Sequence, residues 1–350
     1  MFCQLELQRQ CFLPSVRQVL EELPEGLDGT YERVLKEIKK ANQKHTHRLL
    51  QCLAMAVRPL RVDELAEVLT MDFNVEGTPK LNPDWRWVDP ERAVKSAGSS
   101  LVAVVNNGDS QVAQFSHFSV KEFLMSSRLA ESSGDISHYR VSLEPAHTIF
   151  AQACLGVLLQ LDDHDDHDSI GSFPLAQYAA KYWVKHARFE NVSPQIADEI
   201  DCLFDGDKPH FATWLWIYNE DHQYTYGMQS SQHKAVPLYH AAMLGLRDLV
   251  ERLLAKRPED LEAEVGFKVT PLHASAAAGH TDVFLLLIEH LPDVDIRGRW
   301  DQTPLHIASW NGRLEIRQWL LSYGADANAR NNSRETPLYL AVWKGELEFA

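Results

Sequence analysis

The sequence predicts a mainly α-helical protein that contains one small β-hairpin and ends in an α-solenoid of short repeats. Four segments near the C-terminus repeat one motif at near-constant spacing, which is typical of repeat arrays. Upstream, apolar residues recur mostly at helical spacing, and one Asn-Gly turn separates two short apolar runs. The chain has 350 residues, 45% hydrophobic and 24% charged, which suits two or three ordinary domains.

The N-terminal third predicts helices followed by one hairpin. Helical spacing, Pro and Gly breaks and the Asn-Gly turn define the boundaries. In chain order the predicted elements are a helix before Pro24, a helix from Asp28 to about residue 40, helices over 45–57 and 61–73, a loop over 77–90, a short helix from Glu91, a hairpin over 101–117 and a helix over 118–130. Three helices and a hairpin make a winged helix.

This segment resembles the winged-helix region of NACHT proteins, the regulatory nucleotide switches of the STAND class. The resemblance covers about residues 2–130 and is carried by LPEGLDGTYERVL, RPLRVDELAEVL and FSHFSVKEFLMS. It implies that His117 is the family's nucleotide-sensing histidine, which helps hold the closed, diphosphate-bound state in a longer protein. The alternative is a structural residue that bridges the hairpin and the next helix.

The phosphate-binding loop of those switches is absent from the sequence. No G-x-x-x-x-G-K-[ST] motif occurs, so backbone amides and a lysine that could hold phosphates are missing. A histidine alone cannot hold a nucleotide, and we expect no cofactor unless an upstream NACHT core exists. We therefore expect the chain to begin within a larger domain and to end within the second helix of its fourth repeat.

Residues 131–228 predict a helical spacer. The segments EPAHTIFAQACLGVLLQL, FPLAQYAAKYWVKHARF and PHFATWLWIY carry apolar residues at helical spacing. Because a repeat array needs the apolar side of its first unit covered, we expect the last of these helices to cover it.

The repeat is anchored on prolines that are 34, 33 and 33 residues apart, each followed eight residues later by glycine. The anchors are Pro237, Pro271, Pro304 and Pro337, and the glycines are Gly245, Gly279, Gly312 and Gly345. A threonine before the proline can accept an N-terminal amide, proline suits the first helical position, and glycine supplies the left-handed conformation that ends the helix. Amphipathic second helices follow, as in TDVFLLLI.

With its T-P-L-H motif and trailing glycine, the segment from Val236 to Ala350 resembles ankyrin repeats. The order of winged helix, spacer and repeats is most similar to fungal NACHT–ankyrin proteins. We predict four segments: 1–42, the end of the NACHT helical region; 43–130, the winged helix; 131–228, the spacer; and 229–350, four repeats.

Two groups of residues follow from the ankyrin resemblance. The first holds the stack, with the histidine rings expected to bond to neighbouring repeat backbone: Thr270, Pro271, His273, Gly279, Thr303, Pro304, His306, Gly312, Thr336, Pro337 and Gly345. The second is predicted to bind a protein partner from the hairpin tips and inner helices: Phe267, Lys268, Arg297, Arg299, Trp300, Trp310, Arg330, Asn331 and Trp343. The alternative for these tryptophans is packing against the loop of a neighbouring repeat.

Other features suggest chemistry but have simpler interpretations. The acidic segment 162–168, DDHDDHD, offers metal ligands, yet it lies between helices and we expect a solvated loop rather than a metal site. His45 and His47 would diverge on a helix, and Cys52 and Cys154 lie on apolar helical faces, as buried thiols do. No hydrolase motif occurs, so we expect no enzyme activity.

Charge and cysteine usage limit the remaining function classes. The formal charge of −15 argues against duplex binding, and the predicted helix 89–98 offers only Arg92 and Lys95. Five scattered cysteines and the lack of a long apolar run or signal peptide predict a cytoplasmic protein. We expect a non-enzymatic interaction and regulatory portion of a NACHT-type switch. The alternatives are a nucleotide hydrolase with an upstream P-loop domain and a winged-helix nucleic-acid binder.

Overall fold

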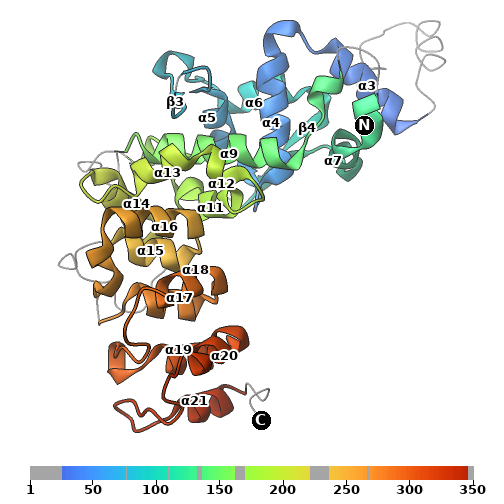
Figure 1. Ribbon diagram of the computed structural model, residues 1–350. Helices are drawn as coiled ribbons and strands as arrows, with labels where there is room; N and C mark the ends of the chain where they lie inside the picture. The colour runs from blue at the N-terminus through green and yellow to red at the C-terminus, as the bar shows by residue number, and fades with distance from the viewer. Residues whose placement is uncertain are drawn as a thin grey trace, which may run out of the picture. The chain divides into compact units, whose positions relative to one another are not determined.

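The computed structural model describes residues 26–75, 77–108, 110–131, 136–161, 170–220, 236–265 and 268–345 (Figure 1). The chain divides into two compact units, one within 1–160 and 165–196 and the other within 161–164 and 197–350. Helices dominate both units, as the composition and spacing predict. Among the described residues, no helix combines the length and the apolar character that crossing a bilayer requires.

The first unit holds the predicted winged helix and the first part of the spacer. Its helices are α3 (Leu27–Glu37), α4 (Gln43–Met55), α5 (Val62–Leu69), α6 (Pro90–Gly98), α7 (Phe118–Met125), α8 (Ser127–Glu131), α9 (Leu143–Leu158), α11 (Ala176–Ala187) and α12 (Val192–Gln195), with short 3-10 turns between them. Its strands are β1 (Leu60–Arg61), β2 (Met71–Asp72), β3 (Lys80–Leu81), β4 (Val102–Asn107) and β5 (Ser110–Phe115).

The sheet of the winged helix has the order β1-β5-β4, so the hairpin predicted from the Asn-Gly turn is joined by a third strand. Leu60 lies opposite Ala113, and Val105 lies opposite Val112. Strand β1 was not predicted, β2 lies at the end of the segment predicted as a helix over 61–73, and β3 lies in the segment predicted as a loop. Strands of two residues are too short to show an alternating pattern, and only their tertiary partners define them.

The core of this unit is formed by helices that face the sheet. Leu49, Leu65, Val94 and Leu124 are all buried there. Helix α4 also contacts α9, and α9 packs along α11 (Figure 1). The first spacer helices, α9 and α11, therefore form one body with the winged helix, whereas the later part of the predicted spacer, from residue 197, belongs to the second unit.

The second unit is the repeat array. Its helices are α13 (Ala197–Leu203), α14 (Pro209–Glu220), α15 (Pro237–Leu244), α16 (Arg247–Lys256), α17 (Pro271–Ala278), α18 (Thr281–Ile288), α19 (Pro304–Trp310), α20 (Leu314–Ser322) and α21 (Pro337–Lys344). The first helix of every repeat begins at its anchor proline, and the four trailing glycines have positive φ, as predicted. The inner helices α15, α17, α19 and α21 follow one another as successive layers (Figure 1).

Helix α14 covers the first repeat with aromatic side chains. The rings of Phe211 and Trp214 lie 5.5 and 6.3 Å from the ring of His240 on α15. Trp214 is only 1% exposed. This is the role that the sequence predicts for the PHFATWLWIY segment.

Candidate functional site

The repeat unit contains a hollow of about 500 Å³ on its inner helices and hairpin tips. Helices α17, α19 and α21 form its floor, and the tips that precede α19 and α21 form its rim. Of the residues predicted to bind a partner, five line it: Arg299, Trp300, Trp310, Asn331 and Trp343. Phe267 lies outside the described residues.

Two stacked tryptophans form one wall of the hollow. The rings of Trp310 and Trp343 lie 5.2 Å apart at 23°. Both residues stand two positions before the glycine of their repeat. Because the two repeats are neighbours in the stack, these equivalent positions bring the two rings together. The same position on α17 is Ala277, which lines the hollow with a methyl group and leaves space beside the stack. Trp343 is 68% exposed in spite of the contact.

A third tryptophan stands on the rim in an unfavourable backbone conformation. Trp300 has φ 56° and ψ 26°, the left-handed region that bulky residues avoid. Trp300 is 51% exposed, and the centre of its ring lies 4.0 Å from the guanidinium carbon of Arg299. Strain of this kind is concentrated at functional sites, because folding alone would favour Gly or Asn here.

Replacement of Trp300 by asparagine is therefore expected to change the free energy of unfolding by less than about 1 kcal/mol, since relief of strain offsets the lost contact with Arg299. Chemical denaturation of the full chain measures this. As a matched control, Trp214→Ala removes a buried ring and is expected to cost about 3 kcal/mol or more. A loss of that size at Trp300 would identify a packing residue.

Two of the predicted partner-binding residues also hold the tips in shape. Asn331 is buried, donates from Nδ2 to Glu335 Oε2 at 2.9 Å and accepts the Glu335 amide at 2.9 Å. Asn331 thus holds the turn and also lines the hollow. Arg297 Nη1 donates to the carbonyls of Asp301 and Arg330, both at 3.0 Å, and so joins two successive tips. Lys268 and Arg330 are exposed at the tips.

The motif histidines connect each repeat to the next. Thr270 Oγ1 and the Thr270 amide lie 2.9 and 3.3 Å from His273 Nδ1, so Nδ1 accepts, and Nε2 donates to the Gln302 carbonyl at 3.3 Å. His306 repeats the pattern with Thr303 and the Glu335 carbonyl, at 2.8 and 3.1 Å. Burial lowers the pKa of His273 to about 4 and also lowers the pKa of His306, so that it disfavours the protonated form of both rings.

In the first unit, His117 lies at the N-terminus of α7. Its Nδ1 accepts from the Ser119 amide at 3.3 Å and lies 2.6 Å from Ser119 Oγ, which in turn lies 2.8 Å from the hydroxyl of Tyr31. The ring is exposed, with that of Phe118 4.3 Å away. His117 thus caps a helix and connects it to α3.

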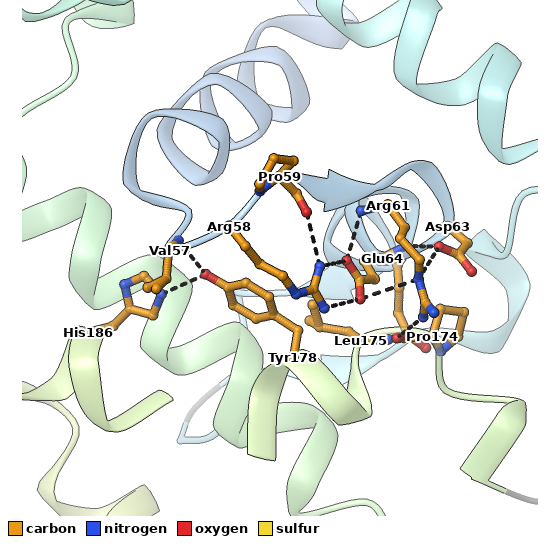
Figure 2. Close-up of polar contacts among 11 residues, drawn as sticks. Val57, Arg58, Pro59, Arg61, Asp63, Glu64, Pro174, Leu175, Tyr178 and His186 are labelled. Atoms are coloured by element: carbon orange, nitrogen blue, oxygen red, sulfur yellow. Dashed lines mark hydrogen bonds and ion pairs between the residues drawn. The ribbon is translucent and has the colours of Figure 1, made fainter. Parts of the chain in front are cut away.

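A polar network that the sequence analysis missed joins the winged helix to α11 (Figure 2). Arg58 donates from both terminal nitrogens to Glu64, at 2.6 and 2.8 Å, and the Arg61 amide donates to the same carboxylate at 2.8 Å. Arg61 Nη2 then reaches the Pro174 carbonyl at 3.0 Å. The carboxylate of Glu64 is 0% exposed. From the sequence, only the contact between Arg61 and Glu64 could have been predicted, because these two residues are three positions apart at the start of a helix.

Beside this network, a chain of hydrogen bonds runs from Val57 into the spacer. The Val57 amide donates to the Tyr178 hydroxyl at 3.0 Å, and that oxygen lies 3.1 Å from His186 Nε2. His186 Nδ1 lies 2.9 Å from His147 Nδ1. Every bond is satisfied when Tyr178 donates to His186 and His186 donates to His147. Burial lowers the pKa of His186 to about 3, consistent with a neutral ring.

Among the described residues no metal-ligand cluster occurs, and two of the three free thiols are buried. No group of three His, Cys, Asp or Glu side chains converges among them, and segment 162–168 lies outside them. Cys52 and Cys154 are buried as predicted, and burial raises the pKa of Cys52 to about 12. On α6, Lys95 pairs with Glu91 of the same helix.

Comparisons with known proteins agree with these two folds. Residues 238–331 match the family of ankyrin repeats in three copies, and residues 31–135 match the winged helix domain of GPI inositol-deacylase. The chain therefore carries ankyrin repeats and a NACHT-associated winged helix, as predicted.

Curated relatives come from fungi and a spider. Azaphilone pigments biosynthesis cluster protein L of Monascus ruber is 29% identical over 79% of this chain and 61% of its own length. Vegetative incompatibility protein HET-E-1 of Podospora anserina is 27% identical over 57% of this chain and 15% of its length. Alpha-latrocrustotoxin-Lt1a of Latrodectus tredecimguttatus is 39% identical over 18% of this chain and 4% of its own length. The chain thus spans less than two thirds of each relative, and its resemblance to fungal NACHT–ankyrin proteins is confirmed.

Proposed function

We propose that this chain, which combines ankyrin repeats with a NACHT-associated winged helix, is a regulatory interaction module that binds a protein partner in the hollow around Trp300, Trp310 and Trp343. The observation that carries the proposal is the gathering of three partly exposed tryptophans around one hollow of about 500 Å³. Aromatic side chains beside arginine are the usual anchors of protein interfaces. The repeat motif holds the stack, and the partner is selected by residues outside that motif.

Replacement of Trp300 and Trp310 together by alanine is expected to abolish partner capture and to leave the melting temperature nearly unchanged. Affinity capture from an extract of the source organism, compared by quantitative mass spectrometry, measures the first effect, and calorimetry measures the second. Trp319→Ala is the matched control, since Trp319 is 40% exposed on α20 and does not line the hollow. Equal capture by the double variant and by Trp319→Ala would contradict the proposal.

The regulatory part of the proposal concerns His117 and a longer protein. In a protein with an upstream NACHT core, His117 is the candidate nucleotide sensor, and its exposed position at the start of α7 supports that role. The intact mass of the endogenous product, captured through its repeats, tests this. P-loop peptides upstream of Met1 would support a nucleotide switch, whereas a product of 350 residues would support a separate adaptor.

A further inference from the structure

We infer that the hollow accepts an acidic peptide segment, in which an apolar side chain enters beside the tryptophans and Asp or Glu residues on either side meet cations of the rim. This inference rests on the proposed function and adds the chemistry of the partner. Three observations carry it: the charges of the tips, the cations stacked on the tryptophans, and the internal partners of the local carboxylates.

The hairpin tips and the end of α21 are basic in a chain whose formal charge is −15. Each described tip contributes at least one cation, and α21 contributes another close to its end. The cations are Lys268, Arg297, Arg299, Arg330, Arg334 and Lys344, and the carboxylates on the same tips are Glu264, Asp301 and Glu335. This surface therefore attracts anions locally, although the whole molecule repels them.

Cations already cover the tryptophan faces at the hollow. The guanidinium of Arg299 lies 4.0 Å from the centre of the Trp300 ring, and the Lys344 ammonium lies 4.9 Å from that of Trp310. Stacking of this kind holds a long cationic side chain in place and so reduces the entropy lost when a carboxylate binds it. A lysine-rich partner would instead meet like charges and occupied rings.

The carboxylates on the tips before α19 and α21 are engaged within the protein. Asp301 lies 3.7 Å from Arg297 Nη1, and Glu335 Oε2 accepts from Asn331 at 2.9 Å. These two carboxylates support the tips, and Arg299 and Lys344 lie over the tryptophans. Charge complementarity therefore favours an acidic segment over a neutral or basic one.

The test is a selection of random dodecapeptides displayed on phage against the full chain, with the Trp300→Ala/Trp310→Ala variant as counter-selection. Asp and Glu are expected to be enriched about threefold over the naive library, beside at least one apolar residue. Selected peptides that need the tryptophans but carry no excess of acids would overturn the inference and leave the proposed function intact. The absence of any peptide that needs the tryptophans would count against the proposed function itself.

Charge reversal then tests the cations directly with a selected peptide as probe. Lys344→Glu, alone and with Arg299→Glu, is expected to weaken binding, by about tenfold for the pair. Lys256→Glu, an exposed change on α16 away from the hollow, is the control. Melting curves verify that each variant folds. If the double variant does not fold, the single variant Lys344→Glu decides the question. Equal affinity for Lys344→Glu and Lys256→Glu would overturn the inference.

Discussion

Replacement of Arg58 by methionine is expected to lower the free energy of unfolding of the first unit by about 2 kcal/mol, because it leaves a buried carboxylate without its bidentate partner. Glu64 has a side chain that is 0% exposed, whereas that of Arg58 is 34% exposed. Solvent near Arg58 and the remaining bond from the Arg61 amide keep the cost below that of a wholly buried pair.

A second change separates charge from packing. In the double variant Arg58→Met/Glu64→Gln, the amide oxygen still accepts from Arg61 but carries no charge, so about half of the lost stability is expected to return. Lys36→Met is the matched control, because Lys36 and Glu32 form an exposed pair at 3.5 Å, expected to contribute less than about 0.5 kcal/mol. Urea denaturation followed by hydrogen exchange in α5 and α11 localises the effect. Equal losses for Arg58→Met and Lys36→Met would show that the network does not stabilise this unit.

Acidification from pH 7 to pH 4 is expected to destabilise the repeat unit through its buried histidines. Burial lowers the pKa of His240 to about 3 and that of His273 to about 4, both from 6.5. The unfolded chain therefore binds protons that the folded array excludes, and the stability that these two histidines contribute is fully present only above pH 6.5. As pH falls from 6.5 towards 4, each such histidine removes up to about 1.4 kcal/mol per pH unit.

The variant His273→Gln isolates one of these contributions. Gln can accept from Thr270 and donate to the Gln302 carbonyl without binding a proton, so the stability of the variant is expected to fall less steeply between pH 6.5 and 4. Urea midpoints of both proteins across this range give the difference, in which carboxylates common to both cancel. Parallel curves would show that His273 excludes no proton in the folded array.

Much of the repeat unit could be predicted because its signals are local. Proline at the first helical position and glycine in the left-handed conformation act within one turn of the chain, and every inner helix begins at its proline. Repetition also placed Trp310 and Trp343 in one column, which is why the position of the candidate site followed from sequence. The roles of single residues in the site did not follow from sequence. Asn331 accepts a hydrogen bond within its own turn, and the strain at Trp300 is a property of backbone angles.

The sequence alone determined the helical class, the register of the repeats, the hairpin and the residues from which the candidate site is drawn. Only the tertiary structure decided that β1 joins the hairpin and that Arg58 and Glu64 pair. It also decided that Arg61 reaches Pro174, 113 positions away, and that Val57 reaches Tyr178, 121 positions away. The reason is physical. Caps and turns depend on neighbours in the chain, whereas buried charges and short strands are stable only beside partners that folding brings to them.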